Sequence, residues 1–184
     1  SVGVYVAPYF TLENSNSTEI LQKPDESIED FTNRMKGHVY KMAYWFPDNT
    51  YTVTISFKKY LPYQDVVKIF HTYNLTSATQ VYYKVNSLKG PPSLAKNKSI
   101  EEQLQILKNN LIQDFRMTVF ENDPIYKKAV AELEADKMFI GYITFEATPK
   151  IVKEILDNLD SVQVAQVIVN KDIPFAGIPP EEKN

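Results

Sequence analysis

The sequence contains no cysteine, and it has only five glycines and two histidines in 184 residues. The absence of cysteine excludes thiolate nucleophiles and every zinc site with a cysteine ligand. Few glycines argue against a phosphate-binding loop, since such a loop needs glycine where a strand turns into a helix. No apolar run approaches the ~20 residues that a membrane-spanning helix requires. The chain is still long enough to bury a core without disulfides or metals.

Charges of both signs are mixed along the chain, and the formal net charge is −3. A general nucleic-acid-binding protein shows clustered basic residues, so we do not expect a nucleic-acid partner. Aromatic residues are plentiful, with twelve tyrosines against one tryptophan. The composition is therefore that of a globular domain with aromatic side chains to place in a core or on a binding surface.

A strand–helix–strand pattern occurs twice, at about 51–86 and 138–169. In the first copy Val53, Ile55 and Phe57 alternate with polar residues, which predicts a strand with Thr54 and Ser56 on its solvent side. In the second copy the strand that begins at about residue 138 is apolar on both faces, which is typical of a central strand. A proline opens the helix of each copy.

Other local patterns place the remaining elements. A capping box at Ser27 begins a short helix, and alternating residues predict a strand at His38–Phe46 that pairs with 51–58 through a tight turn. A second capping box at Ser99 begins a helix, and Asp123 with Pro124 begins another. The apolar stripe of the helix after Ser99 consists of Ile100, Leu104, Leu107, Leu111 and Phe115. A further strand is predicted at Val2–Ala7.

These elements predict an α+β fold, in which two βαβ repeats form one mixed sheet with helices packed on one face, plus an edge hairpin. We expect residues 1–184 to form a single domain, because each repeat alone would have a small core. The stretch 87–98 contains Gly90-Pro91-Pro92 and predicts a hinge or flap. The alternative is two βαβ lobes joined there.

No combination of residues predicts catalysis. Neither His38 nor His71 lies in a nucleophile motif, and both are expected at the surface. Spacings typical of metal ligands or of a calcium loop are absent from the sequence. We therefore assign no catalytic, metal-binding or cofactor-binding residue and do not expect an enzyme. An enzyme using His71 and carboxylates in a cleft near Gly90 is the weakest alternative.

Aromatic residues are the one group that indicates binding. Tyrosine and tryptophan are enriched at interfaces, because they bury a large area while keeping a polar group. We expect Tyr44, Trp45 and Tyr82 to form a partner-binding patch, and core packing is the alternative explanation. The expected ligand is a protein or a component of the cell envelope.

The two repeats resemble the C-terminal, extracytoplasmic region of membrane-anchored sigma factor regulators from Gram-positive bacteria, which are similar to anti-sigma factors. The likeness covers about residues 51–169. In the first repeat it rests on Ser56-Phe57, Pro62 and Val66-Val67. In the second it rests on Gly141, Thr148-Pro149, Ile155-Leu156 and Val162 to Val164.

This resemblance implies a non-enzymatic binding or sensing domain on the outer face of the cell membrane. Such a domain is held by a membrane anchor that lies outside this sequence, and it acts in signal transduction. The family motif supplies no catalytic residues. The alternative is a structural cell-surface module that forms homo-oligomers through an edge strand, either Val2–Ala7 or His38–Phe46.

Overall fold

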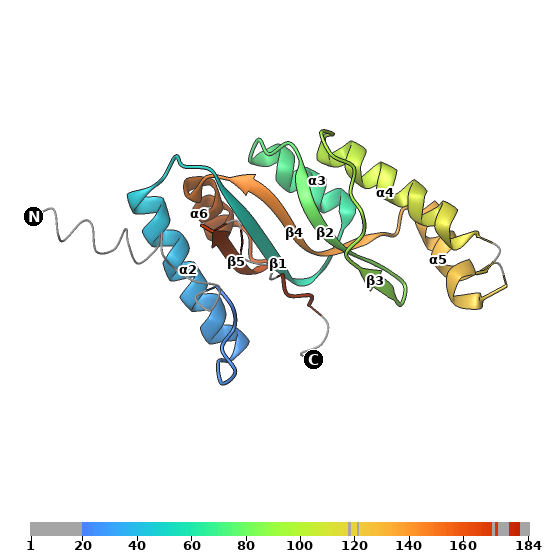
Figure 1. Ribbon diagram of the computed structural model, residues 1–184, viewed down its shortest axis with the longest axis horizontal. Helices are drawn as coiled ribbons and strands as arrows, with labels where there is room; N and C mark the ends of the chain where they lie inside the picture. The colour runs from blue at the N-terminus through green and yellow to red at the C-terminus, as the bar shows by residue number, and fades with distance from the viewer. Residues whose placement is uncertain (1–19, 118, 121, 171, 173–176, 181–184) are drawn as a thin grey trace, which may run out of the picture. The chain divides into compact units, whose positions relative to one another are not determined.

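The computed structural model describes residues 20–117, 119–120, 122–170, 172 and 177–180 (Figure 1). The predicted strand Val2–Ala7 lies outside the described residues. The helices are α2 (Ile28–Trp45), α3 (Tyr63–Thr72), α4 (Ile100–Phe115), α5 (Pro124–Glu134) and α6 (Pro149–Asn158). The strands are β1 (Tyr51–Pro62), β2 (Ala78–Val85), β3 (Leu88–Gly90), β4 (Phe139–Ala147) and β5 (Val162–Ile168).

In the described part of the chain, five helices accompany one antiparallel sheet with the strand order β3-β2-β4-β1-β5. The predicted α+β class is confirmed. The predicted repeats are β1-α3-β2 and β4-α6-β5, and they interleave, because β4 lies between β1 and β2. This is the split βαβ connectivity of ferredoxin-like folds, here with β3, α4 and α5 between the repeats. The doubly apolar β4 is the central strand, as predicted.

The chain divides into two compact units. The first consists of Ser1–Ser56 with Thr144–Ile178, and the second of Phe57–Ile143 with Pro179–Asn184. Strands β1 and β4 each contribute residues to both units. The expectation of a single domain over 1–184, with a hinge at 87–98, stays a prediction.

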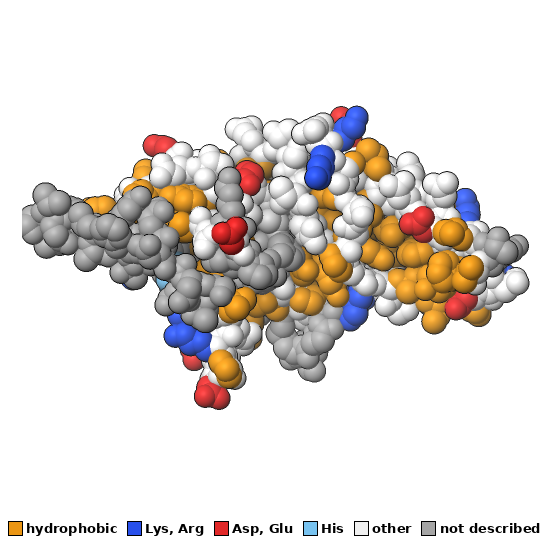
Figure 2. Space-filling view, in the orientation of Figure 1, with side chains coloured by type: hydrophobic (Ala, Val, Ile, Leu, Met, Phe, Trp, Pro, Cys, Tyr) orange, Lys and Arg blue, Asp and Glu red, His pale blue; other side chains and the backbone are white. Residues whose placement is uncertain are grey.

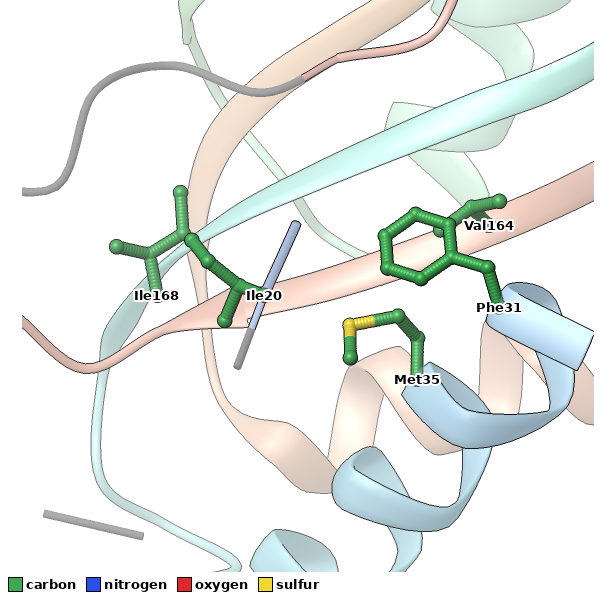
Figure 3. Close-up of a cluster of buried hydrophobic side chains, with 5 residues drawn as sticks. All are labelled: Ile20, Phe31, Met35, Val164 and Ile168. Atoms are coloured by element: carbon green, nitrogen blue, oxygen red, sulfur yellow. The ribbon is translucent and has the colours of Figure 1, made fainter. Parts of the chain in front are cut away.

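In the first unit, α2 packs against β5 and α6. Its buried side chains recur every three or four residues and so form one helical face. These side chains are Phe31, Met35, Val39 and Met42. Figure 3 shows the first two, on successive turns of α2, gathered with Ile20, Val164 and Ile168. This cluster forms the core between α2 and β5.

The predicted strand His38–Phe46 is wrong, because α2 continues through it to Trp45. Ser27 caps the helix by accepting a hydrogen bond from the backbone N–H of Asp30 (3.0 Å), as the capping box predicts. The buried face that begins at Phe31 then carries on past residue 38. The alternating aromatic residues misled the prediction, because a long helical stripe outweighs a short alternation.

In the second unit, α4 packs against α3 and α5, and α5 packs against β2. All five residues of the predicted α4 stripe are buried, and Ser99 caps this helix. The edge hairpin lies here, between β2 and β3, and not between 38–46 and 51–58. Tyr83 pairs with Gly90, and Val85 pairs with Leu88. Asn86, at the turn, has a φ of 54°, a conformation that asparagine tolerates well.

Thr54 and Ser56 of β1 are fully buried, although their alternation predicts the solvent side. Their hydroxyl groups have partners, as buried polar groups require. The Oγ1 atoms of Thr54 and Thr144 lie 2.8 Å apart, and Ser56 Oγ accepts a hydrogen bond from Ile178 N–H (3.0 Å). A segment far away in the sequence therefore covers this side of β1, and local alternation cannot reveal that.

Candidate functional site

Tyr44 and Trp45, two of the three residues predicted to bind a partner, lie at the C-terminal end of α2. Tyr44 is 77% exposed, whereas Trp45 is partly buried. The two rings meet edge to face, with centroids 5.0 Å apart and planes at 87°. An aromatic pair with one exposed ring, in this geometry, offers contact area while losing little conformational entropy on binding.

The helix that carries this pair is tied to α6 within the first unit. The Tyr40 hydroxyl donates a hydrogen bond to Asp157 Oδ1 (2.5 Å), and Lys153 Nζ pairs with Asp157 Oδ2 (2.9 Å). The Tyr40 hydrogen bond, followed by that from Lys153, lowers the pKa of Asp157. Lys153 also lies over the Tyr40 ring, 5.2 Å from its centroid. These contacts fix α2 one turn before Tyr44.

Tyr82, the third predicted residue, lies on β2 in the second unit. Its ring stacks on that of Tyr142, with centroids 4.9 Å apart and planes at 26°. Tyr142 is only 6% exposed, and burial, with Tyr82 as a second cause, raises its pKa to about 12. That Tyr82 shares a patch with Tyr44 and Trp45 stays a prediction.

A pocket of about 330 Å³ lies in the second unit. It is lined by Tyr60, Lys84, Asn86, Glu132 and Phe139. The ammonium group of Lys84 lies 4.9 Å from the centroid of the Tyr60 ring. The same ring covers Gly141, where an added Cβ would come within 2.7 Å of Tyr60 Cε1. Sequence reasoning missed this pocket, because its residues come from three strands, a turn and a helix.

A cluster of Tyr63, Lys108 and Asp136 joins the start of α3 to α4 and to the turn after α5. Tyr63 donates a hydrogen bond to Asp136 Oδ1 (2.9 Å), and Lys108 Nζ pairs with the same oxygen (2.5 Å). Lys108 and then Tyr63 lower the pKa of Asp136. Hydrogen bonding to Asp136 raises the pKa of Lys108, and burial raises that of Tyr63. All three pKa shifts lead away from neutrality, so near pH 7 Asp136 and Lys108 are charged and Tyr63 is neutral.

The two histidines lie on different helices, α2 and α3. His71 is exposed in the last turn of α3, as predicted, and His38 is partly buried within α2. Within the described ranges, no group of three or more His, Cys, Asp and Glu side chains could hold a metal ion.

The connection between α4 and α5 carries a surface that sequence reasoning did not identify. Met117 is 54% exposed, Val119 is 81% exposed and Ile125 is 47% exposed. Figure 2 shows hydrophobic side chains gathered on the surface at α4 and α5. The sequence signal that could have identified this surface is the set of apolar residues within 117–120, which follows the last residue of the buried α4 stripe.

None of the helices in the described part is both long and apolar enough to cross a membrane. No protein-family model matches the chain, and neither a curated protein nor a solved structure matches it.

Proposed function

We propose that the chain is a non-enzymatic binding and sensing domain, and that it forms the extracytoplasmic part of a membrane-anchored regulator of a sigma factor. One observation carries the binding function: Tyr44 holds 77% of its surface in solvent beside Trp45. The signal would be transmitted by a ligand that binds one conformation of the anchored protein more tightly than another.

The support for binding comes from preorganisation. A partner that covers Tyr44 and Trp45 buries two aromatic rings, which are the side chains that most often dominate interface energetics. The Tyr40–Asp157 hydrogen bond and the buried face of α2 already hold their helix in place. Because this helix is already ordered, binding costs little conformational entropy, and this favours a higher affinity.

The finer part of the proposal, the membrane-anchored regulator, rests on the resemblance. Its residues have structural roles in this chain: Thr148 caps α6 by accepting a hydrogen bond from Ile151 N–H (3.3 Å), and Gly141 makes room for Tyr60. Such residues support a likeness of fold. They say nothing about the ligand, which is expected to be a protein or an envelope component.

The first experiment is to determine the coding sequence immediately upstream of residue 1. A transmembrane segment preceded by a cytoplasmic module is expected. An in-frame cytosolic start would contradict the extracytoplasmic location, and a cleavable signal peptide alone would favour a surface module. In that case the mass in solution should rise with concentration, although not through a strand at 38–46, which is helical.

The second experiment tests the aromatic pair in the full-length protein. Tyr44→Ser and Trp45→Ala should each shift the response of a sigma-dependent reporter by about fivefold or more, as loss of an interface anchor does. Lys41→Ala, an exposed position on the same helix, is the control. An unchanged response in both variants, or a large fall in melting temperature for Trp45→Ala, would contradict the proposed role.

A further inference from the structure

We propose that the end of the α4–α5 pair binds a short peptide segment of a partner protein, one that presents an apolar side chain next to a carboxylate. This site lies within the second unit and is distinct from the Tyr44–Trp45 pair. The inference does not depend on the proposed function. It rests on the shape of the surface, on the exposure of its apolar side chains and on its charge.

The shape is concave. A pocket of about 350 Å³ is lined by Phe115, Arg116, Lys127 and Val130. Phe115 is 9% exposed and Val130 is 8% exposed, so the apolar part of the lining is largely buried. A cavity of this volume is at the lower end of the range for ligand sites, and it suits one or two side chains.

Exposed apolar side chains lie next to the pocket in the sequence. Five large hydrophobic residues among those described are exposed, and three of them lie here: Met117 and Val119 in the connection, and Ile125 at the start of α5. In the same region, the Phe120 ring stacks on that of Tyr126, with centroids 4.2 Å apart, and Phe115 meets Tyr126 edge to face at 5.3 Å. Stacked rings keep the surface in one shape, which lowers the entropic cost of docking.

The charge of the lining selects the ligand. Two of its residues are cations, and none of the described lining residues is an anion. Arg116 is paired with Glu134, but Lys127 has no ion-pair partner among the described residues. A carboxylate on the ligand would complement Lys127, while the neighbouring apolar side chain would fill the space between Phe115 and Val130. An acidic and apolar peptide fits both requirements.

The lining is concave, which favours a peptide as the ligand over an anionic membrane. A surface that binds such a membrane would be convex and apolar, with cations around it. The experiment separates the two. A displayed library of random short peptides is panned on the intact chain. The affinity of each enriched peptide is then measured by fluorescence anisotropy, and vesicles of phosphatidylglycerol and phosphatidylcholine are tested in parallel.

Enriched peptides should carry an apolar residue beside Asp or Glu, and their binding should weaken as salt is added. Lys127→Glu should weaken binding by about tenfold or more, because like charges then meet in the pocket. Val119→Ser should weaken it several-fold. The matched controls are Lys128→Glu, an exposed neighbour outside the lining, and Leu21→Ser, an exposed residue of the first unit.

Because Lys127 and Val119 are exposed, their variants should keep the melting temperature of the parent chain. Enriched peptides without acidic residues would overturn the proposal. Equal losses for Lys127→Glu and Lys128→Glu would also overturn it, since that result indicates non-specific attraction. Binding to vesicles that depends on Val119, without any peptide ligand, would assign the surface to a membrane instead.

Discussion

Gly141 offers a direct test of how the central strand is packed. It is buried in β4, and an added Cβ would lie 2.7 Å from Tyr60 Cε1 and 3.0 Å from Pro180 Cδ. Its φ lies outside the left-handed region, so alanine can adopt the same backbone conformation. The effect of Gly141→Ala is therefore steric, and either the Tyr60 ring or the strand must move.

The expected magnitude follows from two opposing terms. Alanine in place of glycine in a strand gains roughly 0.5–1 kcal/mol of conformational entropy, whereas an overpacked core costs about 1–3 kcal/mol. The variant should thus lose about 1 kcal/mol in the free energy of unfolding. In a Tyr60→Ala background the closest atom is gone and only Pro180 Cδ remains in tight contact, so the same change should cost clearly less free energy of unfolding.

Urea unfolding of the parent, the two single variants and the double variant measures this coupling. If the two changes add to within about 0.5 kcal/mol, Tyr60 does not restrict residue 141 and the reasoning is refuted. Gly37→Ala is the matched control, since nothing lies within 4 Å of its added Cβ in α2. It should stabilise the chain by roughly 0.5–1 kcal/mol, as alanine does in a helix.

Three further predictions concern hydrogen bonds and pH. Gln103 is 1% exposed, and its side-chain amide forms hydrogen bonds with both the N–H and the C=O of Ala78 (2.8 Å each). Gln103→Leu should lower the free energy of unfolding, measured with urea, by at least about 2 kcal/mol, because two buried backbone groups lose their partner. Ser99→Ala removes the α4 cap and should cost about 1 kcal/mol in the same assay, with Ser99→Asp close to the parent. Burial raises the pKa of Tyr142 from 10.0 to about 12, so its contribution to stability is complete below pH 10 and is lost as the pH rises towards 12. Thermal unfolding of Tyr142→Phe should therefore show a shallower loss over that interval, and a loss as steep as in the parent would contradict the assignment.

The starts of four helices could be predicted from the sequence because their signals are local, whereas the C-terminal end of α2 could not. Ser27 and Ser99 each accept a hydrogen bond from the third residue of their helix, and Asp123 and Thr148 cap helices that begin with proline. A cap and an apolar stripe lie within a few turns of each other. Their meaning does not depend on the rest of the chain.

Features set by contacts distant in sequence could not be predicted. The alternation of β1 identifies the face of Val53 and Ile55 correctly, but the burial of Thr54 depends on Thr144, 90 residues away. Local sequence patterns also do not show that the repeats interleave. The two strands of a repeat have the same apolar pattern whether they are neighbours in the sheet or have a strand of the other repeat between them. In α2, the aromatic residues after His38 satisfied a strand period and a helix period together.

For the same reason, the exposed apolar surface between α4 and α5 could be recognised only from the structure. An apolar run in a connection between helices is usually buried, and nothing in residues 117–120 says otherwise. The buried stripe of α4 ends at Phe115, so the residues after it can reach the core only if the chain folds back over it. In the structure Met117 and Val119 remain exposed, while Phe120 is held against Tyr126. What distinguishes this surface from Leu21 is that Met117 directly follows Phe115 and Arg116, two residues that line a pocket with two cations, whereas Leu21 belongs to the first unit.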